Sequence, residues 1–218
     1  MQSAFLEMFG DPGSNPKGWE SKLVGELAAE EKNSIKAGPF GSTLKKDCYV
    51  DKGYKIYGQE QVIRDDLSFG DYYITDDKLI EFEAYQVKAG DILISLVGTY
   101  GKISIVPQAF EPGIINPRLM KITLNQGVVL PIFFKHLLMT DAFILRMQHA
   151  SHGGTMDIMN LGLMKSLVVY IPPLVLQRQF AGLVEKVESL RAKQRDSEKE
   201  LENLFNSLMQ RAFRGELV

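Results

Sequence analysis

The segment Gly98-Thr99-Tyr100-Gly101-Lys102 contains the residue types of a phosphate-binding loop, because glycines and a lysine lie close together. A P-loop also needs a glycine at the first position of its spacing and a Ser or Thr after the lysine to hold magnesium. Leu96 occupies that first position and Ile103 follows the lysine. The segment therefore does not predict nucleotide binding, and turn formation is the alternative interpretation of its glycines.

Side chains for other chemistry are present, but not in the spacings that the chemistry needs. The histidines His136, His149 and His152 lack the cysteine or carboxylate spacing of a zinc site. No GxGxxG follows a predicted strand, no GxSxG elbow occurs, and nothing pairs two carboxylates as acid and base. The sequence therefore predicts a chain with no catalytic site, no metal and no cofactor of its own.

Charge is unevenly distributed along the chain, although the formal net charge is only −2. Acidic residues outnumber basic ones between positions 59 and 91, and basic residues outnumber acidic ones between 99 and 170. This asymmetry permits a basic face on a near-neutral protein. A scatter of these charges over a solvated surface is the alternative, and the net charge itself gives no sign of nucleic-acid binding.

The elements that must position these residues are short, and they predict a mixed α+β fold. Residues 1–9 are predicted to end a helix, because Gly10-Asp11-Pro12-Gly13 supplies helix-stop chemistry. Segments with strand character separated by glycines predict a globular domain of short twisted strands. The predicted strands are 54–62, 91–97, 102–106, 114–123 and 166–171, and the predicted helices are 76–85 and 131–147. The predicted boundaries are 1–18 for the helix end and turn, 19–173 for the globular domain and 174–214 for a long C-terminal helix.

The C-terminal segment predicts a coiled-coil helix with a polar interruption at Gln194 and Ser197. Basic residues dominate before the interruption and acidic residues after it, so two such helices would pair favourably when antiparallel. At about 1.5 Å per residue the helix would be roughly 60 Å long, longer than a domain of this size is wide. A surface helix packed on its own domain is the alternative. The heptad positions are Phe180, Leu183, Val187, Leu190, Gln194, Leu201, Leu204 and Leu208.

The end of the chain repeats its beginning, since Met209-Gln210-Arg211-Ala212-Phe213 resembles Met1-Gln2-Ser3-Ala4-Phe5. This repeat predicts one unit of a tandem or two-fold arrangement.

Cys48 is the single cysteine of the 218 residues, which favours a reducing, cytoplasmic setting without disulfides. No apolar run approaches the roughly 20 residues that a membrane-spanning helix needs, so no membrane association is expected.

Several motifs occur in an order that resembles the specificity subunit of type I restriction-modification systems, over essentially the whole chain. Each motif is weak alone, and the ordered set is specific. The motifs are Glu7-Met8-Phe9-Gly10-Asp11-Pro12, Asn15-Pro16-Lys17-Gly18-Trp19, Gly38-Pro39-Phe40-Gly41-Ser42 with Leu44, Gly90-Asp91-Ile92-Leu93-Ile94-Ser95, Gly98-Thr99-Tyr100-Gly101-Lys102, Asn116 with Arg118-Leu119, Gly153-Gly154-Thr155, Asn160-Leu161, and Ile171-Pro172-Pro173-Leu174 with Gln177-Arg178-Gln179.

The resemblance implies a target recognition domain over 19–173 that reads one half of a split sequence in double-stranded DNA. It implies antiparallel pairing of the long helix with a second copy or second half. It also implies methyltransferase (modification) subunits and a restriction subunit as partners, with S-adenosylmethionine, ATP and Mg expected only on those partners. One recognition domain is present where the family has two. The chain is therefore predicted to be a natural half-subunit or a fragment, and the helix end at 1–9 slightly favours the fragment.

Three glycine-punctuated loops, 36–46, 99–102 and 148–160, are the predicted DNA-contacting segments, because rigid scaffolds present binding residues on loops. Lysine and arginine would hold phosphates, while asparagine, glutamine and arginine would read base edges. The stretch 148–152 is the preferred segment for base contacts, because motifs shared across a family do not suit the reading of different sequences. The candidates are Lys36, Ser42, Thr43, Lys45, Lys46, Thr99, Tyr100, Lys102, Arg118, Gln148, His149, Ser151, His152, Thr155 and Asn160.

The leading alternative from another class is a coiled-coil scaffold whose globular domain binds protein and not DNA. The acidic block between 59 and 91 and the near-neutral net charge support it. A nuclease or methyltransferase remnant is disfavoured, because no Asn-Pro-Pro-Tyr-like motif occurs.

Overall fold

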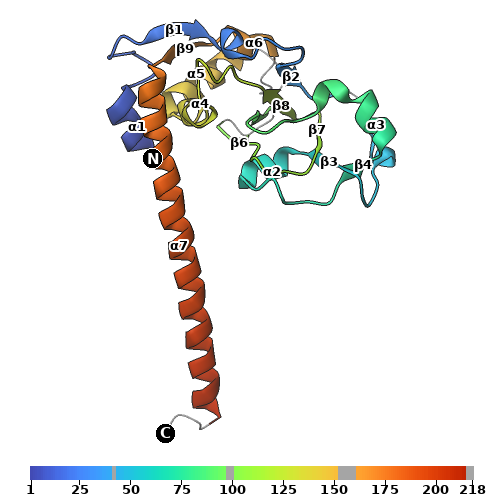
Figure 1. Cartoon of the computed structure of the whole chain (residues 1–218), viewed down its shortest axis with the longest axis vertical. Coiled ribbons are helices and arrows are strands. Elements are labelled where there is room, and N and C mark those ends of the chain that lie inside the picture. The colour runs from blue at the N-terminus through green and yellow to red at the C-terminus, as the bar shows by residue number, and fades with distance from the viewer. Residues whose placement is uncertain (41–42, 97–100, 152–160, 215–218) are drawn as a thin grey trace. The chain divides into compact units, whose positions relative to one another are not determined.

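The computed structural model describes residues 1–40, 43–96, 101–151 and 161–214, with only the backbone described at 149–151. Contacts divide the chain into two units, Met1–Arg178 and Gln179–Val218. Figure 1 shows the first as mixed helices and strands and the second as one helix, so the predicted fold class is confirmed. The first unit contains helices α1 (Gln2–Phe9), α2 (Gln59–Arg64), α3 (Asp76–Glu81), α4 (Pro131–Leu138), α5 (Asp141–Ser151) and α6 (Leu161–Ser166), with 3-10 turns η1 (Val24–Leu27), η2 (Lys46–Cys48) and η3 (Glu83–Tyr85).

The described strands form three small sheets. One pairs β1 with β9, a second has the order β2-β8-β5-β6, and a third has the order β4-β3-β7. All pairs are antiparallel except β3 with β7. The strands are β1 (Glu20–Leu23), β2 (Ile35–Ala37), β3 (Tyr54–Tyr57), β4 (Tyr73–Ile74), β5 (Ile92–Ser95), β6 (Ile103–Ile105), β7 (Gly113–Ile115), β8 (Leu119–Ile122) and β9 (Val168–Ile171).

The four-stranded sheet brings distant loops to one edge. Because neighbouring strands run antiparallel, the ends of β2 and β5 lie beside the starts of β8 and β6. The register confirms this, since Met120 is opposite both Ala37 and Ile94, and Ile94 is opposite Ile103. We call this edge the loop end of the four-stranded sheet. The segments that leave it or enter it are those after Ala37, after Ser95, before Ile103 and before Leu119.

The predicted stop after the first helix is confirmed. Gly10 adopts a left-handed φ of 79° and its N–H donates to the Leu6 carbonyl oxygen, which ends α1. The following turn returns the chain, because the Trp19 indole donates to the Phe9 carbonyl at 2.8 Å. Phe9 and Phe133 of α4 have ring centroids 4.9 Å apart. Aromatic packing thus anchors α1 to α4 within the first unit.

The core of the first unit contains apolar clusters and a few buried charges that are paired. Lys55 is 1% exposed and donates to Glu111 at 2.6 Å and to the Ser68 carbonyl at 2.7 Å. Lys121 and Asp91 are also buried, 3.9 Å apart. Burial raises the pKa of Asp91 and lowers that of Lys121. Within the described chain, each buried side-chain nitrogen or oxygen has a hydrogen-bond partner, as the cost of burying such groups requires.

Some predicted elements are shorter than expected. The strand predicted over 54–62 is wrong beyond Tyr57, because the Gln61 side chain accepts a hydrogen bond from Gly58 N and starts α2 there. The strand predicted over 114–123 is interrupted at Pro117, which cannot donate to a strand ladder. The helix predicted over 131–147 is divided at Thr140, whose hydroxyl donates to the Leu137 carbonyl and accepts from Phe143 N.

The predicted long helix is confirmed as α7 (Leu174–Phe213), a single helix of 40 residues. Phe180 and Val184 are buried, while Leu190, Leu201, Leu204 and Leu208 are exposed. Among the described residues, no helix is both long and apolar enough to span a bilayer.

Candidate nucleic-acid interface

The loop after β2 is held against the turn before β8. Gly38 N donates to the Leu119 carbonyl at 2.9 Å. A Cβ built on Gly38 would overlap the carbonyl oxygen of Asn116. Only glycine permits this approach, so Gly38 has a structural role. The same contact places the start of the loop beside Arg118.

The loop after β5 is held at the same place. Leu96 N donates to the Arg118 carbonyl at 2.9 Å, and Ser95 N donates to the Lys102 carbonyl at 3.2 Å. Two of the loops predicted to contact DNA therefore meet around Arg118, at the loop end of the four-stranded sheet. Residues 42, 99 and 100 of these loops, predicted as Ser42, Thr99 and Tyr100, lie outside the described residues.

A cleft of about 670 Å³ opens beside Arg118. It brings together Lys46 and Arg118, which are far apart in sequence, with the amides of Gln59 and Asn116. The Asn116 side-chain oxygen accepts from Arg118 N at 2.9 Å, and the Gln59 amide donates to the Ser95 hydroxyl at 2.8 Å. Cationic side chains contact phosphates, and side-chain amides can donate to and accept from base edges.

Aromatic and acidic side chains also line this cleft. Tyr49 and Tyr72 line it, with ring centroids 5.5 Å apart. Burial raises the pKa of the Tyr49 phenol above its ordinary value. Glu60, which is paired with Arg64 at 3.0 Å, and Asp71 also line the cleft. The cleft is thus mixed in charge.

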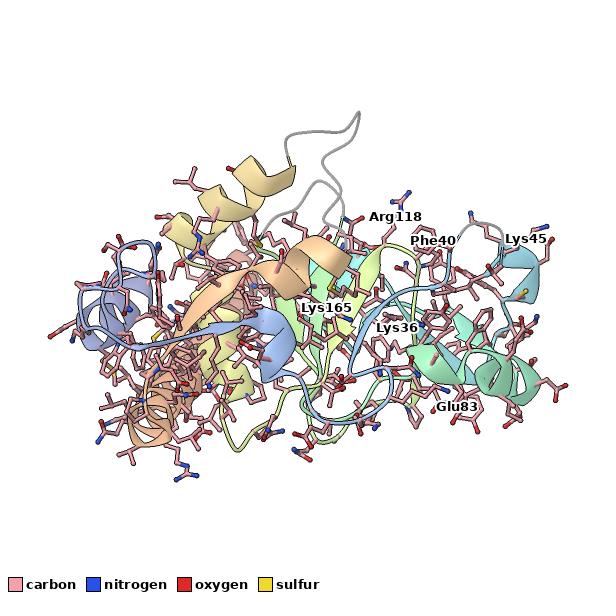
Figure 2. All side chains as sticks on the ribbon, turned by 90° about the horizontal axis from the view of Figure 1, so that it is seen from above. Lys36, Phe40, Lys45, Glu83, Arg118 and Lys165 are labelled. Carbon is pink, nitrogen blue, oxygen red and sulfur yellow. The ribbon has the colours of Figure 1, made fainter. Side chains whose placement is uncertain are left out.

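The first unit contains both ion-paired cations and cations that are exposed and form no ion pair with a described residue, and Lys32, Lys52 and Lys165 are of the second kind. In the described chain, Lys45, Lys46, Lys102 and Arg118 are exposed and form no ion pair, and Lys36 lies 5.2 Å from the centre of the Tyr85 ring. The lysines and arginines that form ion pairs there are Lys22, Lys55, Arg64, Lys78, Lys88, Lys121 and Lys135. Unpaired cations remain available to an external polyanion. Figure 2 shows Arg118 and Lys45 along one edge, with Glu83 at the opposite edge.

The third predicted loop, after α5, is only partly described. Gln148 lies half-buried in α5 and already has an interaction partner. The backbone places His149 and Ser151 in the last turn of α5. His152, Thr155 and Asn160 lie outside the described residues. Gly101 is adjacent to Ile144 of α5, so this helix borders the loop that ends at Lys102.

Two cleft amides and an exposed aromatic were not among the predicted contact residues. Gln59 was missed because 54–62 was predicted as one strand, while the structure turns there into α2. Asn116 was quoted only as part of a motif. Phe40 is 87% exposed, and its position between Lys36 and Lys45 in a glycine-proline turn was the signal that could have identified it. Thr43, which was predicted, donates its hydroxyl to the Phe40 carbonyl.

Comparisons with known proteins agree on one family. A family model described as the type I restriction modification DNA specificity domain matches residues 16–203. The type I restriction enzyme EcoBI specificity subunit of Escherichia coli is 24% identical over 143 residues, which are 64% of this chain and 30% of that protein.

Solved structures show the same fold at low sequence identity. A chain from work on complex assembly and conformational transition of the type I R-M system aligns with a TM-score of 0.65 and 19% identity, over 99% of this chain and 51% of that one. The HsdS subunit from Thermoanaerobacter tengcongensis aligns with a TM-score of 0.60 and 20% identity, over 99% and 50%. The chain thus spans about half the length of these solved relatives and about a third of the curated one.

Proposed function

The chain belongs to the family of type I restriction modification DNA specificity domains, and from that premise we propose that it recognises double-stranded DNA as a non-catalytic specificity subunit or half-subunit. In this proposal residues 19–173 form a target recognition domain that reads one half of a bipartite target. Residues 1–18 end a preceding helix, and residues 174–214 form the spacer helix.

The observation that carries this proposal is the cleft beside the loop end, which brings the unpaired cations Lys46 and Arg118 together with the amides of Gln59 and Asn116. Phosphate contacts supply much of the affinity of DNA-binding proteins, and they need cations that are free to displace the counterions condensed on DNA. Lys45, Lys46 and Lys102 meet that need, because none is in an ion pair with a described residue. Ion-paired lysines such as Lys78 and Lys88 do not.

Sequence reading requires groups that distinguish base edges. The Arg118 guanidinium can donate two hydrogen bonds to guanine, and the Asn116 and Gln59 amides can pair with adenine. All three line the cleft beside the loop end. The predicted stretch 148–152 would contribute further contacts from α5, which borders Gly101. Each good bidentate pair discriminates against a wrong base by about 1–3 kcal/mol.

The partners belong to the same proposal. The matched relatives are named specificity subunits, and one matched chain comes from work on type I complex assembly. We propose methyltransferase subunits and a restriction subunit as partners in the cytoplasm. S-adenosylmethionine, ATP and Mg would bind to those partners.

The second unit supports a pairing role. The α7 side chains Leu190, Leu201 and Leu204 are 57%, 66% and 56% exposed in the single chain. An apolar stripe at heptad spacing is stabilised when it is covered by another helix. The proposed occupant is the equivalent helix of a second copy or second half, antiparallel, because basic residues outnumber acidic ones in the helix before Gln194 and acidic residues outnumber basic ones between 195 and 202.

Fluorescence anisotropy of the full chain with a labelled duplex of random sequence tests this function. The logarithm of the binding constant should fall linearly with the logarithm of salt concentration. The slope should correspond to several phosphate contacts, at about −0.9 for each contact. A chain that acts only as a coiled-coil scaffold would show no salt-linked binding. Repeating the titration with the methyltransferase subunits present would separate weak binding by one half from no binding.

A further inference from the structure

Phe40 is a large exposed apolar side chain that is followed in the chain by the exposed cations Lys45 and Lys46. Its ring is 87% exposed, although the two preceding residues, Gly38 and Pro39, are buried. An exposed phenylalanine forgoes about 1.5–3 kcal/mol that burial would supply. The exposure of this ring therefore needs an explanation beyond the stability of the fold.

The structure holds Phe40 outward from both sides. Before it, Gly38 is fixed against the Asn116 backbone and hydrogen-bonded to Leu119. After it, Leu44 is buried in an apolar cluster with Ile56, Ile74, Phe82 and Ile114. The Thr43 hydroxyl donates to the Phe40 carbonyl between these anchors. The described residues on either side of the ring are thus fixed to the fold.

Positive side chains lie close to Phe40 in the chain. Lys45 and Lys46 follow it, and the Gly38 contact places the start of its loop beside Arg118, whereas the Lys36 amine lies over the Tyr85 ring of η3. Figure 2 shows the side chains of Arg118, Phe40 and Lys45 along the same edge of the first unit. An aromatic ring that docks on a protein is expected to be surrounded by other apolar side chains. A ring close to unpaired cations instead suits DNA, which has negative phosphates outside and flat bases inside.

We propose that Phe40 inserts its ring into duplex DNA as an apolar wedge that stacks against a base, while Lys45 and Lys46 hold the flanking phosphates. Proteins that insert apolar side chains between base steps combine a wedge with cations in this way. Stacking of aromatic rings on bases tolerates any sequence, so the contact is independent of the target that is read. This inference rests on the proposed DNA recognition and adds a specific contact to it.

A tryptophan at the wedge position reports stacking directly. Phe40→Trp is expected to lose fluorescence when the full chain binds a random-sequence duplex, because stacking on bases quenches the indole. The wild-type chain, with Trp19 as its single tryptophan, supplies the baseline. Ile80→Trp is the matched control, since Ile80 is 73% exposed on α3 among acidic residues, and its signal should not respond to DNA.

Affinity measurements separate the wedge from a phosphate contact. Phe40→Ala should weaken duplex binding about tenfold, the effect of losing one stacked base. It should leave the slope of binding against salt unchanged, because no charge is removed. The melting temperature should also stay at the wild-type value, since the ring is exposed.

The outcomes are distinguishable from failure of the proposed function. Three results together would overturn the wedge: the wild type shows salt-linked binding, DNA does not quench Phe40→Trp, and Phe40→Ala binds with full affinity. These results would leave the proposed DNA recognition intact. A Phe40→Trp signal that responds to the methyltransferase subunits and not to duplex assigns the ring to protein docking and also overturns it. Absence of any salt-linked binding by the wild type, alone or with those subunits, rejects both proposals.

Discussion

Gly38 lies so close to Asn116 that a Cβ on Gly38 would overlap the Asn116 carbonyl oxygen. This contact joins the loop after β2 to the turn before β8, and the hydrogen bond from Leu96 N to the Arg118 carbonyl joins the loop after β5 to the same turn. One turn thus organises two loops that carry the candidate DNA contacts.

Replacing Gly38 by alanine should displace the loop. The added methyl group meets backbone atoms, which cannot move aside as a flexible side chain can, and we expect a loss of about 1–3 kcal/mol in the free energy of unfolding. Gly182→Ala is the control, because nothing lies within 4 Å of the added Cβ on that helical residue. Urea denaturation checks both variants, and equal stability of Gly38→Ala and wild type would contradict the contact.

Removing loop lysines should weaken DNA binding without regard to sequence. Lys45→Ala or Lys46→Ala is expected to reduce affinity for all duplexes alike and to lower the slope of log binding constant against log salt by about 0.9 for each lost phosphate contact. Lys78→Ala, which removes a lysine paired with Glu81 on α3, is the matched control. Salt titrations by anisotropy measure the slopes, and unchanged slopes in both loop variants would remove this loop from the interface.

The sequence predicts the fold class well because local patterns determine it. The glycine stop after α1 and the heptads of α7 depend on neighbouring residues, and both are found in the structure. The predicted helix 131–147 is divided at Thr140, and β3 ends early, because of single side-chain hydrogen bonds. The spacing of apolar residues along the chain does not reveal such hydrogen bonds.

The candidate interface is harder to predict, since strand order decides which loops meet. The sequence identifies Lys45, Lys102 and Arg118 as suitable types. The proximity of Lys102 and Arg118 follows from the order β2-β8-β5-β6, which no local pattern contains. Gln59 joins the cleft only because α2 begins at that residue.

Stability should depend on pH through His136. Burial, and then the positive charge of Lys135, lower the pKa of this imidazole from 6.5 to about 4. Between these values the unfolded chain binds the proton and the folded chain does not. Stability is therefore full above pH 6.5 and is lost as the pH falls toward 4, by about 2 kcal/mol once partial solvent screening is allowed for.

His136→Gln removes the titrating group and should flatten this part of the pH dependence. Urea unfolding of variant and wild type at pH 7 and pH 5 measures the difference. Parallel stability curves for the two proteins over this range would show that His136 is not the group responsible.

The exposed stripe of α7 should mediate self-association. Leu204→Glu is expected to weaken the proposed dimer, because it places a charge at an apolar heptad position. Asn203→Glu adds the same charge at the exposed neighbouring position and should leave the mass unchanged. Light scattering coupled to size-exclusion chromatography gives the masses, and a wild type that is monomeric at every concentration would argue against pairing between two copies.

Lysine footprinting tests the central claim most directly, because one experiment covers both candidate and control lysines. The full chain is acetylated with and without duplex DNA, and each lysine is quantified by mass spectrometry. Protection by DNA should be confined to Lys36, Lys45, Lys46 and Lys102, while the exposed lysines Lys52 and Lys88 react equally in both samples. Protection of Lys52 or Lys88 with unchanged reactivity at the loop end of the four-stranded sheet would contradict the account.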